Sequence, residues 1–311
     1  MNELQNSPYV VGNDDGYLRW RETKLASYPE SVSELRVEIN DLQQLTAEEH
    51  QALLSRCRKT NMVVYAARSA ASMIDKEVLR SFARQLGLQH LDPNMLADDD
   101  GITSLEVIPG KLQRGYIPYS DRRLLWHTDG YYNSGDCQIR AMLLHCVRPA
   151  AEGGKNALLD PEIAYLLLRD RDPRYIEALM ANDVMTIPAN IEADEVERPA
   201  QTGPVFSVSP ADGSLHMRYT ARTRSIEWKD DVLTQEAVAA LEELLDSHST
   251  YIFRYKLQAG EGLLCNNVLH NRTAFTAESV DADNDQHGRL LYRARYYDRI
   301  AGTGLADEDH K

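Results

Sequence analysis

Residues 122–130, which read RRLLWHTDG, pass from a strand-like run into a turn and carry the most informative polar pair of the chain. In an extended segment, side chains two apart project to the same face, so His127 and Asp129 are expected to lie side by side. An imidazole and a carboxylate on one face provide two of the three ligands of a facial metal triad. A histidine in a strand is also commonly a hydrogen-bonded structural residue, so the pair needs support from elsewhere in the chain.

The same stretch is one of about eight β-like runs that follow residue 102. Glycine, proline, asparagine or aspartate separates most of these runs, as expected for strands joined by turns. This pattern predicts a mainly β fold with flanking helices, in which the strands form a jelly-roll or barrel. The runs occupy residues 102–108, 122–128, 139–147, 156–159, 214–220, 250–257, 261–269 and 289–297.

The first hundred residues have a different, more helical character. Thr46 and Glu49 form a capping box that predicts a helix near 46–59. A short buried strand is expected at 61–66, and Asp75 is expected to begin a second helix that ends at Gly87. Residues 1–30 are polar and contain scattered tyrosine and tryptophan, which predicts an irregular lead-in.

Two further helices interrupt the β-runs, one near 160–182, broken by Pro173, and one near 234–247. We therefore expect a single domain over 1–300, with a helical part at about 1–100 and a β core at about 101–300. Residues 301–311 read as a flexible acidic tail. Acidic clusters at 98–100, 192–197 and 278–285 are expected in solvated loops.

Composition narrows the classes of partner. The chain has 311 residues and a net charge of −14, with 43% hydrophobic and 26% charged residues, which is typical of a globular protein. A nucleic-acid partner is disfavoured because phosphate binding needs a basic face. No apolar run approaches the roughly 20 residues of a membrane-spanning helix, and the start lacks the features of a signal peptide. We expect a cytoplasmic protein without a membrane partner.

A third metal ligand is predicted at His270, which closes the strand-like run GLLCNNVLH before a turn at Asn271 and Arg272. Two histidines and one carboxylate are the ligand set of non-heme Fe(II) oxygenases, and this set leaves three coordination positions open. The other histidines lie in strands without a nearby acid, or in helix, loop and tail positions.

Three arginines recur on one face of the final strand-like run. Arg289, Arg293 and Arg295 are at odd positions, so they share a face of the strand. Burying three guanidinium groups is costly unless anions compensate them. Either these arginines surround an anionic ligand, or they form a solvated outer face. An arginine in this position has the charge and the bidentate geometry that 2-oxoglutarate requires.

Four segments together resemble the TauD/TfdA family of Fe(II)- and 2-oxoglutarate-dependent dioxygenases. They are WHTDG at 126–130, GGKNALLD at 153–160, NNVLHNRTAF at 266–275 and GRLLYRARYY at 288–297. The resemblance covers roughly 100–300, and the N-terminal helices are compatible with it. It implies a double-stranded β-helix fold and hydroxylation of an aliphatic C–H bond by O2, with release of succinate and CO2. The first and last segments look somewhat like the glutarate 2-hydroxylase branch, whose substrate is a small dicarboxylate.

By position, the resemblance implies that His127, Asp129 and His270 hold Fe(II). Arg289 resembles the arginine that pairs with the distal carboxylate of 2-oxoglutarate, and it follows His270 by 19 residues, which is longer than usual in the family. This spacing leaves the choice among the three arginines of the strand open.

Two further positions are implied for the cosubstrate. Arg293 resembles the family position that contacts either the cosubstrate or an acidic group of the substrate. Asn156 stands where many relatives have a threonine that hydrogen-bonds the cosubstrate, and an amide can also donate there.

The sequence points less specifically to residues that contact the substrate. Arg295, Arg218 and Arg222 are the candidates for an anionic or zwitterionic small molecule, and Tyr131 and Tyr132 are candidates for the wall of the site. Surface arginines paired with nearby acids, and ordinary core packing of the tyrosines, explain the same residues equally well. A homo-oligomer is compatible with the family.

Two alternative functions would depend on only some of these residues. A redox-neutral cupin-type metal enzyme would need the triad but no cosubstrate arginine. A non-catalytic β-helix protein that binds a small acid would keep the arginines without needing His127 or His270.

Overall fold

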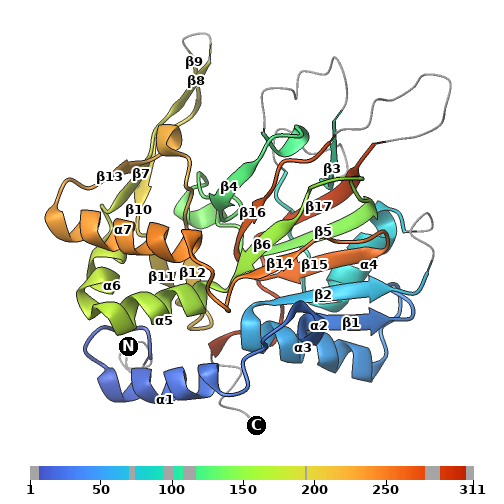
Figure 1. The fold of residues 1–311 in the computed structure, drawn as a ribbon, viewed down its shortest axis with the longest axis horizontal. Coiled ribbons are helices and arrows are strands. Elements are labelled where there is room, and N and C mark those ends of the chain that lie inside the picture. Colours follow the sequence, from blue (N-terminus) through green and yellow to red (C-terminus); the bar gives the residue numbers. More distant parts are fainter. Residues whose placement is uncertain are drawn as a thin grey trace.

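The computed structural model describes residues 7–69, 74–93, 101–107, 117–192, 195–276 and 288–305. Figure 1 shows two sheets on one side of the molecule and a group of helices on the other. The acidic clusters predicted at 98–100 and 278–285 lie outside the described residues. The acidic segment at 192–197 does not form the expected loop, because strands β8 (Asn190–Glu192) and β9 (Glu195–Arg198) pair there as a hairpin that projects from the rest of the ribbon.

The larger sheet has six strands. Adjacent strands are antiparallel, except that the first two in sheet order are parallel. In sheet order they are β1 (Arg36–Ile39), β2 (Met62–Ala67), β15 (Glu261–Cys265), β5 (Ala141–Arg148), β17 (Leu290–Tyr296) and β3 (Thr103–Glu106). β2 is the strand predicted at 61–66, β3, β15 and β17 lie within predicted runs, and β5 extends one residue beyond its predicted run. β1 was not predicted.

The second sheet is antiparallel and carries the residues of most interest. In sheet order it consists of β14 (Phe253–Tyr255), β6 (Asn156–Leu159), β16 (Leu269–Arg272) and β4 (Leu124–His127). The expectation that one strand runs through 261–269 is wrong. Asn267 has a φ of +50°, and the backbone turns there so that β15 and β16 belong to different sheets. His270 is therefore inside a strand rather than at the end of one.

Alternation along the larger sheet separates the core into two clusters. Val63 and Leu264 point to the face covered by the N-terminal helices. Met62 and Leu263 point to the opposite face, where they pack in the same cluster as Leu158 of the second sheet. The main core thus fills the space between the two sheets, and a period-two apolar pattern produces it directly.

Most predictions for the N-terminal helices are confirmed. α3 (Ala47–Thr60) begins at a capping box formed by Thr46 and Glu49, and α4 (Lys76–Gln85) has Asp75 as its N-cap. Gly87 follows α4 with a φ of +81°, a conformation that glycine adopts without strain. The irregular lead-in is wrong, since residues before 36 form α1 (Asp14–Leu25) and the short α2 (Val32–Leu35).

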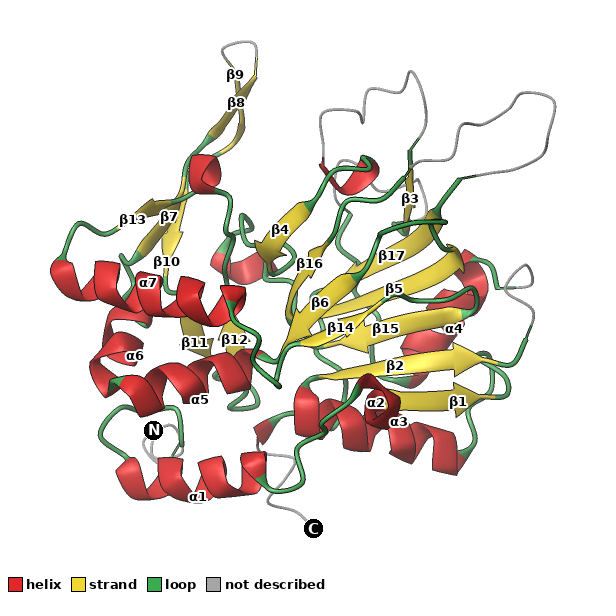
Figure 2. Cartoon of the chain, in the orientation of Figure 1, coloured by secondary structure: helices red, strands yellow, loops and turns green. Residues whose placement is uncertain are grey.

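A second helical group lies beside the smaller strands (Figure 2). Pro173 divides the helix predicted near 160–182 into α5 (Pro161–Arg171) and α6 (Pro173–Leu179), and α7 (Val232–Asp246) packs against both. The remaining strands are β7 (Met185–Ile187), β10 (Gln201–Gly203) and β13 (Glu227–Trp228) in one sheet, and β11 (Phe206–Val208) with β12 (Leu215–Met217) in another. Antiparallel sheets surrounded by helices are the predicted class of fold.

The last described residues are folded, not a tail. Thr303 is buried, its hydroxyl donates to the Ile300 carbonyl, and Arg58 donates to the Gly302 carbonyl at 2.6 Å. Residues 301–305 therefore contradict the expected tail, and 306–311 lie outside the described residues. Within the part of the chain that the structure describes, no helix has the length and apolar character needed to cross a membrane.

A buried ion cluster attaches α1 to the start of α5. Lys24 lies 2.7 Å from the Asp160 carboxylate and also contacts Glu162, and all three side chains are buried. Tyr9 donates to Glu162 at 2.9 Å, so the cluster also ties down the segment before α1. α1 forms no strong apolar stripe, and the buried charge of Lys24 helps to hold it in place.

Replacing Lys24 with methionine should destabilise the protein by about 3–5 kcal/mol, because two carboxylates would stay buried without their cation. The free energy of unfolding from urea titration measures this loss. Arg21→Met is the matched control, since Arg21 pairs with Asp170 at 2.8 Å on the surface of the same helix. We expect less than about 1 kcal/mol for the control. Equal effects of the two variants would contradict the assigned role.

Candidate metal centre

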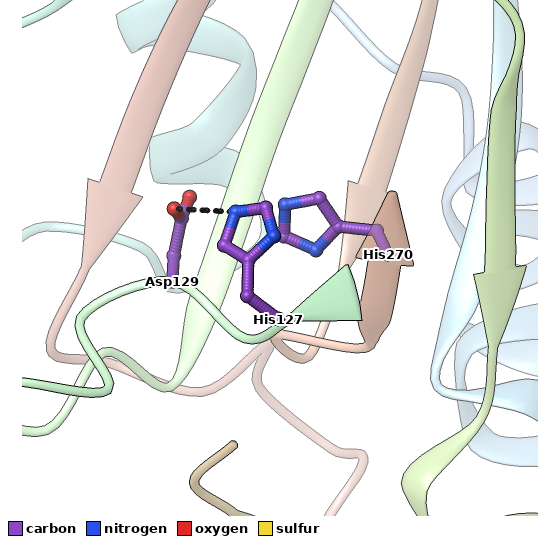
Figure 3. A group of neighbouring side chains, drawn as sticks. All are labelled: His127, Asp129 and His270. Carbon is purple, nitrogen blue, oxygen red and sulfur yellow. Dashed lines mark ion pairs between the residues drawn. The ribbon is translucent and has the colours of Figure 1, made fainter. Parts of the chain in front are cut away.

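His127 and His270 meet because β4 and β16 pair with these two residues in register. The imidazole centroids are 4.2 Å apart (Figure 3). The Nδ1 atom of His127 is 2.9 Å from the Leu125 carbonyl, and Nδ1 of His270 is 2.9 Å from the Val268 carbonyl. A carbonyl can only accept, so each Nδ1 carries the proton and each Nε2 is left with a free lone pair.

Asp129 completes the cluster from the turn that follows β4. Its Oδ1 lies 3.9 Å from Nε2 of His127, and the candidate ligand atoms of all three residues are within 4.8 Å of one another. Asp129 is 5% exposed, and its Oδ2 has no hydrogen-bond partner among the described residues. The predicted proximity of His127 and Asp129 is therefore observed, although a turn rather than strand alternation produces it.

Asn267 positions the turn that carries Asp129. Its side-chain oxygen accepts from the Asp129 amide at 2.8 Å, and its amide group donates to the carbonyls of Asp129 and Ile139 at 2.9 and 2.6 Å. Gly130 has a φ of +65°, and a Cβ atom there would lie 2.4 Å from the Ile139 side chain. Both residues hold the carboxylate at a fixed place beside the His127 imidazole (Figure 3).

The electrostatics favour neutral imidazoles beside an ionised carboxylate. Burial, with repulsion from His270, lowers the pKa of His127 to about 3, and burial also lowers the pKa of His270. Burial alone would raise the pKa of Asp129, but the charges of Arg293 and Arg295 outweigh it and bring that pKa below its usual value. Metal ions bind these protonation states without releasing a proton.

The residues fit an Fe(II) ion. Two imidazole nitrogens and one carboxylate face a common point, and this donor set is that of the facial triad. A buried carboxylate oxygen without a partner is costly and is rare in proteins, so the unpaired Oδ2 of Asp129 supports a cation at this point.

A cavity of about 770 Å³ opens beside the cluster. It is lined by both ligands contributed by the β4 region and by five of the other predicted site residues. These seven residues are His127, Asp129, Tyr131, Tyr132, Arg222, Arg293 and Arg295. The structure thus joins residues from three separate regions of the chain around one space.

Arg293 and Arg295 of β17, and Arg289 just before that strand, do not form a solvated outer face. Arg289, Arg293 and Arg295 are 8%, 8% and 4% exposed. Nη1 of Arg293 lies 3.3 Å from Oδ1 of Asp129, whereas Arg295 pairs with Asp92 and donates to the Tyr132 hydroxyl at 3.0 Å. The alternative of surface arginines is therefore wrong for this strand.

Arg289 differs from its two neighbours. Its guanidinium lies 4.9 Å from the centroid of the Phe275 ring, and it has no carboxylate partner among the described residues. Burial lowers the pKa of Arg289 to about 10, so the cation still persists at neutral pH. A buried arginine without an anion is a binding position for one.

Four predicted site residues are not part of the described cavity lining, namely His270, Arg289, Arg218 and Asn156. Arg218 donates to the carbonyls of Met185 and Gly203 at 2.8 and 3.1 Å, so it ties strands together and does not line the cavity. Asn156, the first residue of β6, pairs with Arg272 of β16 and is half-buried outside the lining of the cavity.

Two residues of the site, Asn267 and Asp92, escaped the sequence analysis, whereas Tyr132 was predicted with Tyr131 as part of the wall. Asn267 was read as part of a strand, although consecutive asparagines are a turn signal that would have marked it. Asp92 and Tyr132 line the cavity and bind Arg295. No sequence signal connects Asp92 with an arginine two hundred residues later.

Asn267→Ala should weaken Fe(II) binding by roughly ten- to hundredfold, because residues that orient metal ligands typically contribute that much. Anaerobic Fe(II) titration measures the dissociation constant. Asn266→Ala is the control: Asn266 is also buried, but it bonds to Asn61, Thr303 and the Ile300 amide rather than to Asp129. If both variants weaken Fe(II) binding equally, general destabilisation explains the effect, and Asn267 does not position the metal ligand.

Comparison with known proteins identifies the family of the chain. The family described as "Taurine catabolism dioxygenase TauD, TfdA family" matches residues 24–295. The chain therefore belongs to the TauD/TfdA family of Fe(II)- and 2-oxoglutarate-dependent dioxygenases.

Two curated relatives are named uridine-5'-phosphate dioxygenase. The one from Streptomyces sp is 31% identical over 182 residues, which cover 54% of this chain and 60% of the relative. The one from Amycolatopsis sp is 35% identical over 96 residues, which cover 31% and 33% of the two chains. The chain thus spans between one third and three fifths of the length of these relatives.

Solved structures share the fold. An asparagine oxygenase in complex with Fe(II), 2S,3S-3-hydroxyasparagine and succinate has a TM-score of 0.57 at 14% identity, over 84% of this chain and 93% of that one. The non-heme iron oxygenase OrfP in complex with Fe and alpha-ketoglutaric acid has a TM-score of 0.58 at 16% identity, over 82% and 81%.

Proposed function

We propose that this chain is an Fe(II)- and 2-oxoglutarate-dependent dioxygenase on a double-stranded β-helix core. It hydroxylates an aliphatic C–H bond of a small anionic molecule and releases succinate and CO2. The observation that carries the proposal is the buried cluster of His127, Asp129 and His270, with an unpartnered carboxylate oxygen, beside a strand of buried arginines. Membership in the TauD/TfdA family supports it.

Nε2 of His127, Nε2 of His270 and the Asp129 carboxylate are the proposed iron ligands. With 2-oxoglutarate, the bound iron supplies the activation of O2. Arg293 keeps Asp129 ionised through its contact at 3.3 Å, so that the carboxylate does not compete for a proton. The bonds from Nδ1 of each histidine to a backbone carbonyl fix the ring orientation.

Arg289 is the proposed partner of the distal carboxylate of 2-oxoglutarate. Its burial and the lack of a described carboxylate partner support this choice over Arg295, which already pairs with Asp92. Asn156 is proposed to donate a hydrogen bond to the cosubstrate. Displacement of water by the bound substrate would let the oxidising equivalents reach the substrate rather than solvent.

The substrate is proposed to be a small anion of one of two kinds. The arginine-rich strands favour a carboxylate, as in a small dicarboxylate. The names of the two curated relatives favour a nucleoside 5'-phosphate. A redox-neutral metal enzyme or a non-catalytic acid-binding protein would not need an anion site in β17 together with the triad, and family membership favours the oxygenase over both.

Anaerobic addition of Fe(II) and 2-oxoglutarate tests the proposal. A weak visible charge-transfer band should appear when the cosubstrate chelates the iron. On admission of O2, succinate should form, and candidate substrates such as uridine 5'-phosphate or glutarate should stimulate it. Failure to form the band, together with failure to produce succinate, would refute the proposed function.

A further inference from the structure

The charges around the cavity do not balance. Its described lining contains four arginines, namely Arg198, Arg222, Arg293 and Arg295, and two carboxylates, Asp92 and Asp129. Arg293 pairs with Asp129, and Arg295 pairs with Asp92. Arg198 and Arg222 have no carboxylate partner among the described residues. In a chain with a net charge of −14, an excess of two cations in one cavity calls for an anionic ligand.

Arg222 extends from a segment that runs beside the metal ligands. The backbone of Thr220 forms a β-bridge with His127, and the Ala221 amide donates to the Trp126 carbonyl at 2.8 Å. The following residue, Arg222, is exposed and lines the cavity. Its backbone position is therefore fixed close to the iron ligands, while its guanidinium makes no hydrogen bond to a described residue.

Arg198 stands at the base of the projecting hairpin. Its guanidinium donates to the Pro188 and Pro199 carbonyls at 2.7 and 3.0 Å and lies 5.7 Å from the centroid of the Tyr132 ring. These neutral partners hold the side chain in place but leave its charge uncompensated. Arg198 therefore contributes a fixed positive potential to the same cavity.

Aromatic side chains form much of the remaining wall. Tyr119, Tyr131, Tyr132 and Tyr297 line the cavity, and the rings of Tyr131 and Tyr132 meet edge to face at 5.2 Å. Aromatic walls of this kind bind planar rings by stacking. A volume of about 770 Å³ lies in the upper part of the range of about 300–1,000 Å³ for ligand sites.

We infer that Arg222 binds the phosphate of a phosphate-monoester substrate that also carries a planar ring, and that Arg198 adds the second compensating charge. A phosphate monoester carries about −1.5 to −2 charges at neutral pH, which matches two unpaired arginines at a single anionic group. The inference rests on the proposed function, since it selects the nucleoside 5'-phosphate class over the dicarboxylate class. It also assigns the substrate anion to a residue distant in sequence from the arginines of β17.

Calorimetric titration of the anaerobic Fe(II)–2-oxoglutarate protein tests the inference, with uridine 5'-phosphate, uridine and glutarate as probes. Wild type should bind the phosphate more tightly than uridine. Arg222→Gln should weaken the binding of uridine 5'-phosphate by roughly ten- to hundredfold. The binding of uridine and the charge-transfer band should stay unchanged. Arg222→Lys should recover part of the loss, because it keeps the charge but not the bidentate geometry.

Arg224→Gln is the matched control, because Arg224 is exposed in the same loop but does not line the cavity. Wild-type affinity for uridine 5'-phosphate in Arg222→Gln would overturn the assignment. Equal binding of uridine and its phosphate by wild type, or Arg222-dependent binding of glutarate alone, would overturn the substrate class. Phosphate binding that depends on Arg222 in a protein without the charge-transfer band would support the subsite and refute only the oxygenase.

Discussion

His127→Ala is expected to remove the charge-transfer band and to reduce succinate formation by far more than a hundredfold. The reason is that residues behind a metal ligand typically contribute ten- to hundredfold, and the loss of a ligand itself exceeds that. His127 presents a free Nε2 toward Asp129 and His270, and no other histidine of the described residues is grouped with these two. Anaerobic absorption and a succinate assay measure the two effects.

The control for this prediction is His248→Ala, an exposed histidine outside the cavity. It should keep both the band and the succinate yield. Circular dichroism separates loss of iron from loss of fold, and a folded His127→Ala variant without iron is the expected state. A variant that retains the wild-type band would show that the iron is held elsewhere.

Arg289→Gln is expected to raise the 2-oxoglutarate concentration required for the band by roughly thirtyfold to several thousandfold. Removing one member of a desolvated charge pair typically costs about 2–5 kcal/mol, and each 1.4 kcal/mol is about tenfold in affinity. Arg289, which immediately precedes β17, has described surroundings that contain a ring and no carboxylate. Iron binding without cosubstrate should not change, because Arg289 does not contact the described ligands.

Arg148→Gln is a suitable control for this second prediction. Arg148 lies on the adjacent strand β5, donates to the Gly288 carbonyl, and pairs with Glu106 at 3.3 Å. The cation is therefore close in the fold but already compensated, and its loss should alter the 2-oxoglutarate requirement little. If Arg289→Gln behaves like this control while Arg293→Gln raises the requirement, the cosubstrate role belongs to Arg293.

The charge of the whole chain conceals how the charges are distributed. The net charge of −14 argues against nucleic acid, yet Arg293 and Arg295 of β17 are buried in the lining of a cavity with an excess of positive charge. Burial in a low-dielectric region strengthens the attraction of these cations for an anion. An acidic protein can therefore bind an anionic ligand.

Local signals predicted those elements whose ends are determined by nearby residues. The capping box at Thr46, the cap at Asp75 and the break at Pro173 each act within a few residues, and each appears in the structure. α1 was missed because its sequence has no clear apolar stripe. Its position depends on Lys24 and on acids at the start of α5, which are far away in the sequence.

The metal ligands were predictable as residue types but not as a geometry. His127 and Asp129 are two residues apart in the sequence, but the turn after β4 is what brings their side chains within 3.9 Å of each other. The approach of His270 requires the pairing of β4 with β16, and that pairing depends on the turn at Asn267. Sequence spacing contains no information about which strands become neighbours, because many pairings satisfy the same apolar pattern.

By itself, the sequence determined the class of fold, the identity of three candidate ligands and the clustering of arginines in the last strand-like run, because residue type and local periodicity act over short distances. The tertiary structure decided which arginine is free to bind. Asp92 compensates Arg295 and Asp129 compensates Arg293, whereas Arg289 and Arg222 have no described carboxylate partner. Charge compensation acts through space over a few ångströms, so only folding reveals which cations remain to hold an anion.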